Sequence, residues 1–287
     1  MIHKTRPEDW QKAADWLIAA DALMITAGAG MGVDSGLPDF RGDEGFWQAY
    51  PPLKQLGLSF VEMANPQGFA RNPPLAWGFY GHRLNLYRRT LPHAGYHLLR
   101  EWGMAKPLGY FVFTSNVDGH FQKAGFDHEH VEECHGSIHR MQCTAPCNEE
   151  VWSAEGIQVE VDEKQFLAAA PLPQCIHCHR LARPNILMFG DDSWIAAPTG
   201  EQSQRRHAWL TALQTRKGKL VIVELGAGQA VATVRFFSER LARLPGASLI
   251  RINPRDCGIN ANNHVALQTG ALEGLTRIAS LLPRHGE

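Results

Sequence analysis

The chain has 287 residues, of which 44% are hydrophobic and 20% charged, and its formal net charge is −1. This length allows a sizeable core and, from the usual size of domains, about two domains. The balanced charge gives no indication of a nucleic-acid partner or of a polybasic membrane anchor, and no apolar run is long enough to cross a bilayer. The polar start, MIHKTRPEDW, lacks the apolar stretch of a secretory signal, so we expect a cytoplasmic protein.

Apolar runs of strand length alternate with helical patterns along the chain. The expected strands are residues 21–26, 108–114, 219–225 and 248–252, with a short fifth strand at 265–268. Helical periodicity separates them at residues 8–20, 76–90, 93–103, 203–216 and 230–243. This alternation predicts an α/β fold with a Rossmann-like, doubly wound parallel sheet. Ligands bind beyond the carboxyl ends of such strands, so we expect the loops after the first four strands to converge on one site.

The loop after the first expected strand is rich in glycine. Gly28, Gly30, Gly32 and Gly36 fall within nine residues. Because glycine has no Cβ, backbone N–H groups in such a loop can approach a phosphate. The standard dinucleotide pattern G-x-G-x-x-G would need a glycine at the position of Val33. The glycines alone therefore leave a tight turn without a ligand as an alternative.

Four of the six cysteines form two close pairs. Cys143 and Cys147 have three residues between them, and Cys175 and Cys178 have two. In a chain without an export signal, such pairs indicate metal ligands rather than disulfides. Four thiolates suit a tetrahedral Zn²⁺ ion with no open position, so we expect a structural zinc ion. A mixed set with His139, or with the histidines beside Cys178, is the alternative.

Polar residues follow the second expected strand and a later loop. Asn116 and Asp118 can hydrogen-bond ribose hydroxyls or orient a water, although such residues also form Asx turns. His135 stands in the sequence E-C-H-G-S and can act as a general base, because the unperturbed pKa of histidine lies near neutrality. A core histidine or a metal ligand is the alternative for this residue.

Together these motifs resemble those of the sirtuins, the NAD-dependent protein deacylases. The resemblance rests on GAGMGVDSGLPDFRG at 28–42, TSNVDGHFQKAG at 114–125, HGS at 135–137, the cysteine pairs, RPNILMFGD at 183–191 and IN at 252–253. These motifs cover nearly the whole chain in the family order. The chain departs from the family pattern at Gly32, Ser115, Asp191 and Ala227-Gly228, and the last pair lacks the hydroxyls that serve the cofactor ribose in the family.

The resemblance implies NAD as cofactor, Zn²⁺ on the four cysteines, and an acylated-lysine protein as substrate. Residues expected to contact NAD are Gly28, Ala29, Gly30, Asp34, Asp39, Phe40, Arg41, Ser115, Asn116, Asp118, Gly226, Ala227, Gly228, Asn253 and Ala271. His135 would be the catalytic base, with Asn116 and Asp118 beside it. Met188, Phe189 and Gly190 would bind the substrate peptide as an added strand. The products would be free lysine, nicotinamide and O-acyl-ADP-ribose.

Tyr80 and Arg83 suggest which acyl group is removed. Residues three apart on a helix face the same way, and a phenol beside a guanidinium group would bind a carboxylate. Sirtuins that remove succinyl and malonyl groups carry Y-x-x-R in a similar context. A packed aromatic with a solvated arginine is the alternative.

Composition changes suggest two insertions. We expect a cofactor loop and helical insertion at 42–90 and a zinc-binding module at 139–185, which leaves 1–41, 91–138 and 186–287 for the NAD-binding domain. We expect a monomeric protein-lysine deacylase with no nucleic-acid or membrane partner. One alternative is protein ADP-ribosyl transfer, because NVDGHFQKAGF resembles the macrodomain-associated sirtuins, although that branch typically lacks the histidine found here at 135. An NAD hydrolase and a non-enzymatic NAD sensor are the others.

Overall fold

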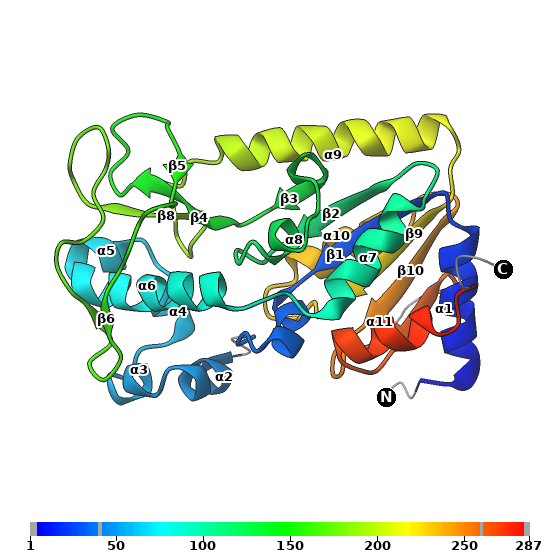
Figure 1. The fold of residues 1–287 in the computed structure, drawn as a ribbon, viewed down its shortest axis with the longest axis horizontal. Helices are drawn as coiled ribbons and strands as arrows, with labels where there is room; N and C mark the ends of the chain where they lie inside the picture. Colours follow the sequence, from blue (N-terminus) through cyan, green and yellow to red (C-terminus); the bar gives the residue numbers. More distant parts are fainter. Residues whose placement is uncertain (1–4, 40–41, 259–260, 284–287) are drawn as a thin grey trace.

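The computed structural model describes residues 5–39, 42–258 and 261–283. Its centre is a six-stranded sheet with the order β11-β10-β9-β1-β2-β3, in which all neighbouring strands are parallel (Figure 1). The strands are β1 (Ala22–Ala27), β2 (Tyr110–Thr114), β3 (Val131–Glu133), β9 (Leu220–Leu225), β10 (Ala247–Ile252) and β11 (His264–Leu267). This is the order of Rossmann-like sheets, and it changes direction between β1 and β9. The predicted doubly wound parallel sheet is confirmed.

Helices cover both faces of this sheet. On one face lie α1 (Pro7–Ala19), α7 (Ala94–Met104), α8 (His120–Lys123) and α11 (Ala271–Ala279), and on the other α9 (Ala197–Thr215) and α10 (Thr233–Leu241). Successive side chains of a strand point to opposite faces. Leu23 and Ile25 of β1 therefore join the core under α1 and α7, whereas Met24 joins the core under α10. Two 3₁₀ helices, η1 (Ala29–Ser35) and η2 (His128–His130), lie in the connecting segments.

The segment between η1 and α7 contains short helices that the sequence pattern did not predict. They are α2 (Gly42–Ala49), α3 (Pro51–Gln55), α4 (Phe60–Met63) and α5 (Gln67–Arg71), followed by the longer α6 (Pro73–Arg89). Each short helix has eight residues or fewer, too few for a periodic signal. Local signals start two of them: Ser59 and Glu62 form a capping box at α4, and Pro51 begins α3.

A second, antiparallel sheet lies next to the cysteine pairs, of which Cys143 ends a strand and the other three cysteines lie in loops. It contains β5 (Trp152–Ser153), β4 (Gly136–Cys143) and β8 (Ala182–Ile186) in that order, and a separate pair is formed by β6 (Val161–Asp162) and β7 (Leu167–Ala168). In Figure 1 these strands lie beside α6, at the end of the molecule opposite the two termini.

The helical insertion and the cysteine-bearing segment share one apolar core. Trp77 of α6 is fully buried and donates a hydrogen bond from Nε1 to the carbonyl oxygen of Ala182 (3.0 Å). A Cβ at Gly78 would lie 2.0 Å from the carbonyl oxygen of Phe166, so the helix and this loop touch backbone to backbone. The two insertions therefore stabilise one another. Among the residues that the structure describes, no helix is both long and apolar enough to span a bilayer.

Candidate active site

A cavity of about 470 Å³ lies where the loops after β1, β2 and β9 meet. Predicted site residues that line it are Gly28, Ala29, Asp39, Tyr80, Arg83, Ser115, Asn116, Asp118, His135, Met188, Phe189, Gly226, Ala227 and Gly228. The strand order reverses between β1 and β9, so the connections that follow these two strands run away from each other. A crevice is left between them at the carboxyl ends of the strands. All four loops predicted to converge therefore contribute to one cavity, the fourth through Asp256 in the loop after β10.

Other predicted contacts lie outside the lining of this cavity. They are Gly30, Asp34, Gly190, Asn253 and Ala271, whereas Phe40 and Arg41 fall outside the described residues. The side chain of Asn253 is fully buried and donates from Nδ2 to the carbonyl oxygen of Ala227 (2.9 Å). Oδ2 of Asp34 accepts a hydrogen bond from the backbone N–H of Leu272 (2.8 Å) in the first turn of α11. Both side chains thus hold surrounding segments in place, and their contact with NAD stays a prediction.

The glycines after β1 and β9 let two loops touch. A Cβ at Gly28 would lie 2.8 Å from the carbonyl oxygen of Gly226, and one at Gly30 would lie 2.7 Å from the Cα of Gly226. Gly226 itself has a φ of +59°, which favours glycine. Close packing of the loops therefore accounts for these glycines, and it also places the backbone of residues 28 and 226–228 on the cavity wall.

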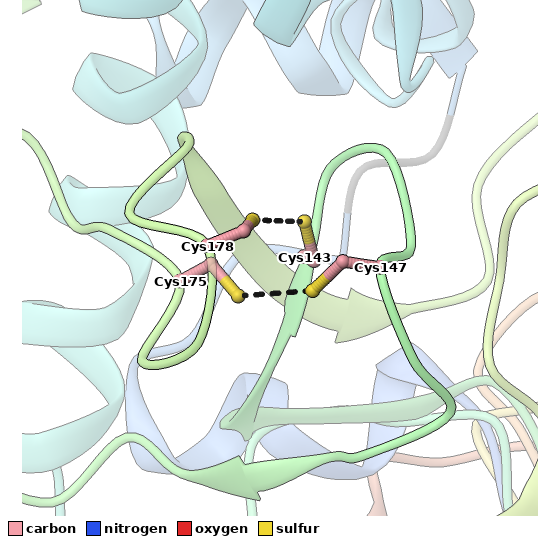
Figure 2. Close-up of side chains that lie close together, drawn as sticks. All are labelled: Cys143, Cys147, Cys175 and Cys178. Atoms are coloured by element: carbon pink, nitrogen blue, oxygen red, sulfur yellow. Dashed lines mark hydrogen bonds between the residues drawn. The ribbon is translucent and has the colours of Figure 1, made fainter.

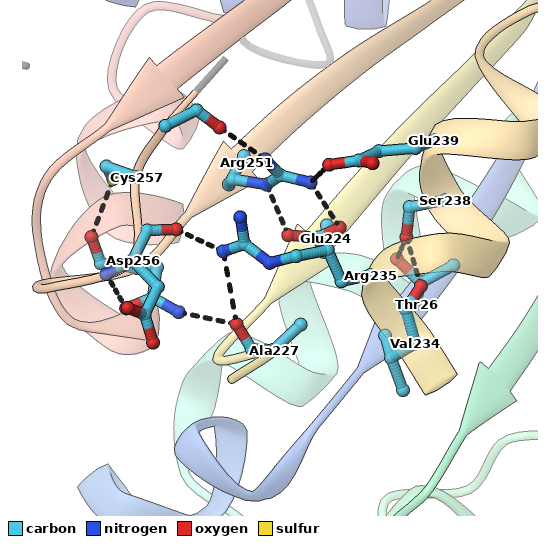
Figure 3. Close-up of polar contacts among 12 residues, drawn as sticks. Thr26, Glu224, Ala227, Val234, Arg235, Ser238, Glu239, Arg251, Asp256 and Cys257 are labelled. Atoms are coloured by element: carbon cyan, nitrogen blue, oxygen red, sulfur yellow. Dashed lines mark hydrogen bonds and ion pairs between the residues drawn. The ribbon is translucent and has the colours of Figure 1, made fainter. Parts of the chain in front are cut away.

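Buried charged side chains of β9, β10 and α10 lie next to the 226–228 loop, and one of them hydrogen-bonds to it (Figure 3). Arg251 of β10 is fully buried and pairs with Glu224 of β9 (2.5 Å) and Glu239 of α10 (2.8 Å). Arg235 of α10 donates from Nη2 to the carbonyl oxygens of Ala227 and Asp256. These contacts fix α10 and the loop that follows β9 against the sheet.

Asn116 and Asp118 line the cavity and also form local hydrogen bonds. Nδ2 of Asn116 donates to the carbonyl oxygen of Gly28 (3.0 Å), which ties the loop after β2 to the loop after β1. Oδ1 of Asp118 accepts from the backbone N–H of His120 (2.8 Å), the first residue of α8. The Asx-turn interpretation and the binding interpretation are therefore compatible for Asp118.

His135 reaches the cavity from the turn between β3 and β4. Gly136 makes this turn with a φ of +76°, and a Cβ there would lie 2.1 Å from the carbonyl oxygen of Asn185 in β8. Burial lowers the pKa of His135 below its usual value. The imidazole is therefore neutral near pH 7, the form that can accept a proton.

Tyr80, Arg83 and Tyr87 form one buried end of the cavity. Arg83 is 7% exposed, which contradicts the alternative of a solvated arginine, and its Nε and Nη2 donate to the hydroxyl oxygen of Tyr87 (3.0 and 2.8 Å). Burial raises the pKa of Tyr80 to about 12, so its phenol remains a neutral donor. Sequence reasoning missed Tyr87 in this role, although its spacing of four from Arg83 on a helix was a usable signal.

The segment predicted to bind a substrate peptide is held by bonds within the chain. The backbone N–H of Leu187 donates to the carbonyl oxygen of His135 (2.9 Å), and that of Phe189 donates to the carbonyl oxygen of Ala64 (2.9 Å). The backbone N–H of Met188 donates to Oδ2 of Asp191 (3.3 Å). Asp191 in turn forms a fully buried ion pair with Arg183 (2.8 Å). The pairing of this segment with an added strand stays a prediction.

Glu133 is a buried carboxyl group near the cavity that the sequence pattern did not mark. It ends β3 and is 3% exposed, and its Oε1 has no hydrogen-bond partner among the described residues. Its backbone N–H donates to Oε1 of Gln202 on α9 (3.0 Å). Burial raises the pKa of this carboxyl group to about 7. No sequence pattern predicted that Glu133 is buried, because α9, the helix that covers it, comes much later in the chain.

We expect Glu133→Gln to stabilise the protein above pH 7. The folded protein keeps the Glu133 proton up to about pH 7, whereas the usual pKa of such a group is 4.5. The free energy of unfolding of the wild type is therefore undiminished below pH 4.5 and falls by about 3 kcal/mol as the pH rises through 7. The neutral amide of the variant does not titrate, so the variant avoids this loss. Urea unfolding should show a gain for the variant at pH 8 and little gain at pH 5. The exposed Glu155→Gln serves as the control, and equal gains at both pH values would contradict this assignment.

The four paired cysteines converge on one point beside the small sheet, between two loops (Figure 2). Their sulfur atoms all lie within 4.8 Å of one another, and Cys143 to Cys178 and Cys147 to Cys175 are both 3.7 Å. A tetrahedron with Zn–S bonds of about 2.3 Å has sulfur atoms about 3.8 Å apart. The cluster is therefore compatible with a structural zinc ion, and among the described residues no histidine belongs to it.

The strand order and the position of the cavity are those of α/β proteins that bind dinucleotides. The sequence model of the Sir2 family matches residues 28–198, more than half of the chain. The chain belongs to the Sir2, or sirtuin, family.

Similar proteins agree with this membership. An NAD-dependent protein deacylase of Thermus thermophilus is 29% identical over 98% of this chain and 96% of its own. NAD-dependent protein deacylase 2 of Pyrobaculum aerophilum is 30% identical over 95% of both chains. Among solved structures, a complex of a Sir2 homologue with NAD has a TM-score of 0.67 at 22% identity and covers 98% of this chain and 96% of its own.

Proposed function

We propose that this protein is an NAD-dependent protein-lysine deacylase of the cytoplasm. The observation that carries the proposal is one cavity that joins the loops after β1, β2 and β9 to a neutral histidine and a buried end formed by α6. The relatives named as NAD-dependent protein deacylases, which align over nearly their whole length, support it. A cluster of cysteine thiols is typical of a reducing compartment, which supports the location.

Different residues of the chain would bind the cofactor, orient it and accept a proton. NAD, when bound, supplies a ribose carbon from which nicotinamide leaves. Backbone groups at Gly28 and Gly226 would lie against the phosphates, because these loops form the cavity wall at the switch point of the sheet. Asn116 and Asp118 would orient the nicotinamide and its ribose, and His135 would take a proton from a ribose hydroxyl. A positioned base of this kind contributes about 10²–10⁴ in rate.

We propose that the four cysteines hold the metal and that its role is structural. Four thiolates fill a tetrahedral zinc ion, so no position is open for a substrate. Arg180 donates from Nε to the sulfur of Cys178 (3.4 Å), which offsets part of the negative charge of the cluster. Between β4 and β8 the segment around the cluster contains only the two-residue strands β5, β6 and β7, and a metal would hold it together.

Product analysis tests the proposed reaction. Mass spectrometry of NAD incubated with acetyl-, succinyl- and malonyl-lysine peptides should show deacylated peptide, nicotinamide and O-acyl-ADP-ribose in equal amounts. Free ADP-ribose formed without any peptide would instead indicate an NAD hydrolase.

The buried end of the cavity supports a preference for acidic acyl groups. A carboxylate at the tip of a succinyl or malonyl group would meet the Arg83 guanidinium and the neutral Tyr80 phenol, whose oxygen has no hydrogen-bond partner among the described residues. A charge-assisted pair in a site without water is stronger than one at the surface.

Arg83→Met is expected to lower desuccinylation far more than deacetylation. Losing a charged hydrogen bond to the substrate costs about 2–3 kcal/mol, which corresponds to a roughly 30- to 150-fold fall in kcat/KM for the succinyl peptide. Peptide assays with both acyl groups measure the ratio. Arg89→Met, an exposed arginine of the same helix, should leave it unchanged. An equal loss of both activities in Arg83→Met would refute the selectivity role.

Protein ADP-ribosyl transfer is the second candidate function. Ala227 and Gly228 offer no hydroxyl to the cofactor ribose, and a Cβ at Gly228 would meet open space, so the site differs from the family pattern there. Biotin-labelled NAD separates the two activities, because label retained on protein supports transfer and label found on a small acyl product supports deacylation.

A further inference from the structure

His139 lies midway along β4, between the proposed base and the first cysteine of the cluster. Sequence reasoning left it open as a metal ligand, but its ring points elsewhere. Its Nε2 is 2.9 Å from the carbonyl oxygen of Asp118, 21 residues earlier in the chain. A carbonyl oxygen can only accept, so Nε2 carries the proton and donates it to Asp118.

The turn that follows β2 is shaped to receive this ring. Gly119 has a φ of +72°, and a Cβ there would lie 2.7 Å from Cδ2 of His139. A side chain at position 119 would thus be strained and would also displace the imidazole. Beside this contact, the backbone N–H of Ile138 donates to the carbonyl oxygen of Val117 (3.0 Å). Strand β4 therefore holds the turn at two successive residues.

This turn sets the direction of the Asp118 carboxylate. Asp118 lines the cavity, is 8% exposed, and accepts through Oδ1 from the N–H of His120. The backbone carbonyl oxygen of Asp118 accepts a hydrogen bond from His139, and its side chain accepts one from the first residue of α8. Both the backbone and the side chain of Asp118 are therefore held. Without His139 the carbonyl oxygen would lose its partner, and only the bond from Ile138 to Val117 and the bond from the His120 N–H to Oδ1 would hold the carboxylate toward the cavity.

From these contacts we infer that His139 is a positioning residue, which holds Asp118 toward the cofactor end of the cavity. The inference rests on the proposed function, because it takes NAD as the ligand beside Asp118. Its effect passes through Asp118, since His139 is not among the residues that line the cavity.

Two variants of the same residue test this role. His139→Leu removes the donor, and we expect KM for NAD to rise about tenfold, the size expected for one lost hydrogen bond, with little change in kcat. Inhibition by nicotinamide should weaken by a similar factor. His139→Gln places an amide N–H near the position of Nε2 and should restore both constants. His97→Leu, an exposed histidine of α7, is the matched control.

Hydrogen exchange in the protein without ligand tests the contact independently of NAD chemistry. The His120 amide should exchange faster in His139→Leu and at the original rate in His139→Gln. If His139→Leu does not accumulate as folded protein, His139→Asn, which is too short to reach Asp118, gives the same comparison.

Unchanged exchange together with an unchanged KM in His139→Leu would overturn the inference, and so would a His139→Gln variant as impaired as His139→Leu. A wild-type protein that turns over no NAD would instead refute the proposed function, while the exchange rates would still decide whether His139 holds the turn.

Discussion

Replacing His135 with alanine is expected to lower the rate of deacylation by about 10²–10⁴ while the protein stays folded. The imidazole lines the cavity and is not fully buried, so its loss should remove less packing than the loss of a core side chain. The burial that lowers the pKa of His135 keeps it ready to accept a proton near pH 7. Single-turnover assays with an acetyl-lysine peptide measure the fall.

The control for this variant is a histidine far from the cavity. His128 has a side chain that is 77% exposed, and His128→Ala should deacylate at the wild-type rate. Calorimetric titration should show that His135→Ala binds NAD as tightly as the wild type. Full activity in His135→Ala would mean that another group serves as the base.

Cys175→Ser is expected to release the metal and to destabilise the small sheet together with the helical insertion. Cys175 is 1% exposed, and a serine hydroxyl does not replace a zinc thiolate. Structural zinc contributes about 10–16 kcal/mol of binding free energy in small modules, so its loss is large compared with the stability of a domain. Elemental analysis should fall from about one zinc ion per chain to none.

The loss should extend beyond the cysteine loops because the two insertions share a core. Trp77, one of eight tryptophans, is buried against the cysteine-bearing segment, so part of the tryptophan emission should shift toward that of an exposed indole in Cys175→Ser. Cys257→Ser, a buried cysteine outside the cluster, should keep the zinc. A Cys175→Ser protein with full zinc content and unchanged fluorescence would exclude this ligand set.

The central sheet could be predicted from the sequence because its strands are buried on both faces. Runs such as residues 219–225 are mostly apolar, and five of the six strands gave this signal. Strand β3 did not, because it has three residues and two of them are Glu132 and Glu133. Glu132 is buried there only because Arg206 of α9 pairs with it (2.5 Å), a partner 74 residues away.

Much of the candidate site could also be predicted, for a different reason. Strand-end loops, the cysteine pairs and His135 are marked by local motifs. The contacts of His139 with Asp118 and of Asn253 with Ala227 join residues that are 21 and 26 positions apart, and no local pattern encodes them. Such contacts decide which polar groups face the cavity, so they become visible only in the folded chain.

A crystal structure with ADP-ribose and an acyl-lysine peptide tests the central claim most directly. The account predicts the diphosphate against the backbone of Gly28 and Gly226, and a ribose hydroxyl about 3 Å from the His135 imidazole. A ligand bound away from these loops, or an imidazole turned from the ribose, would contradict it.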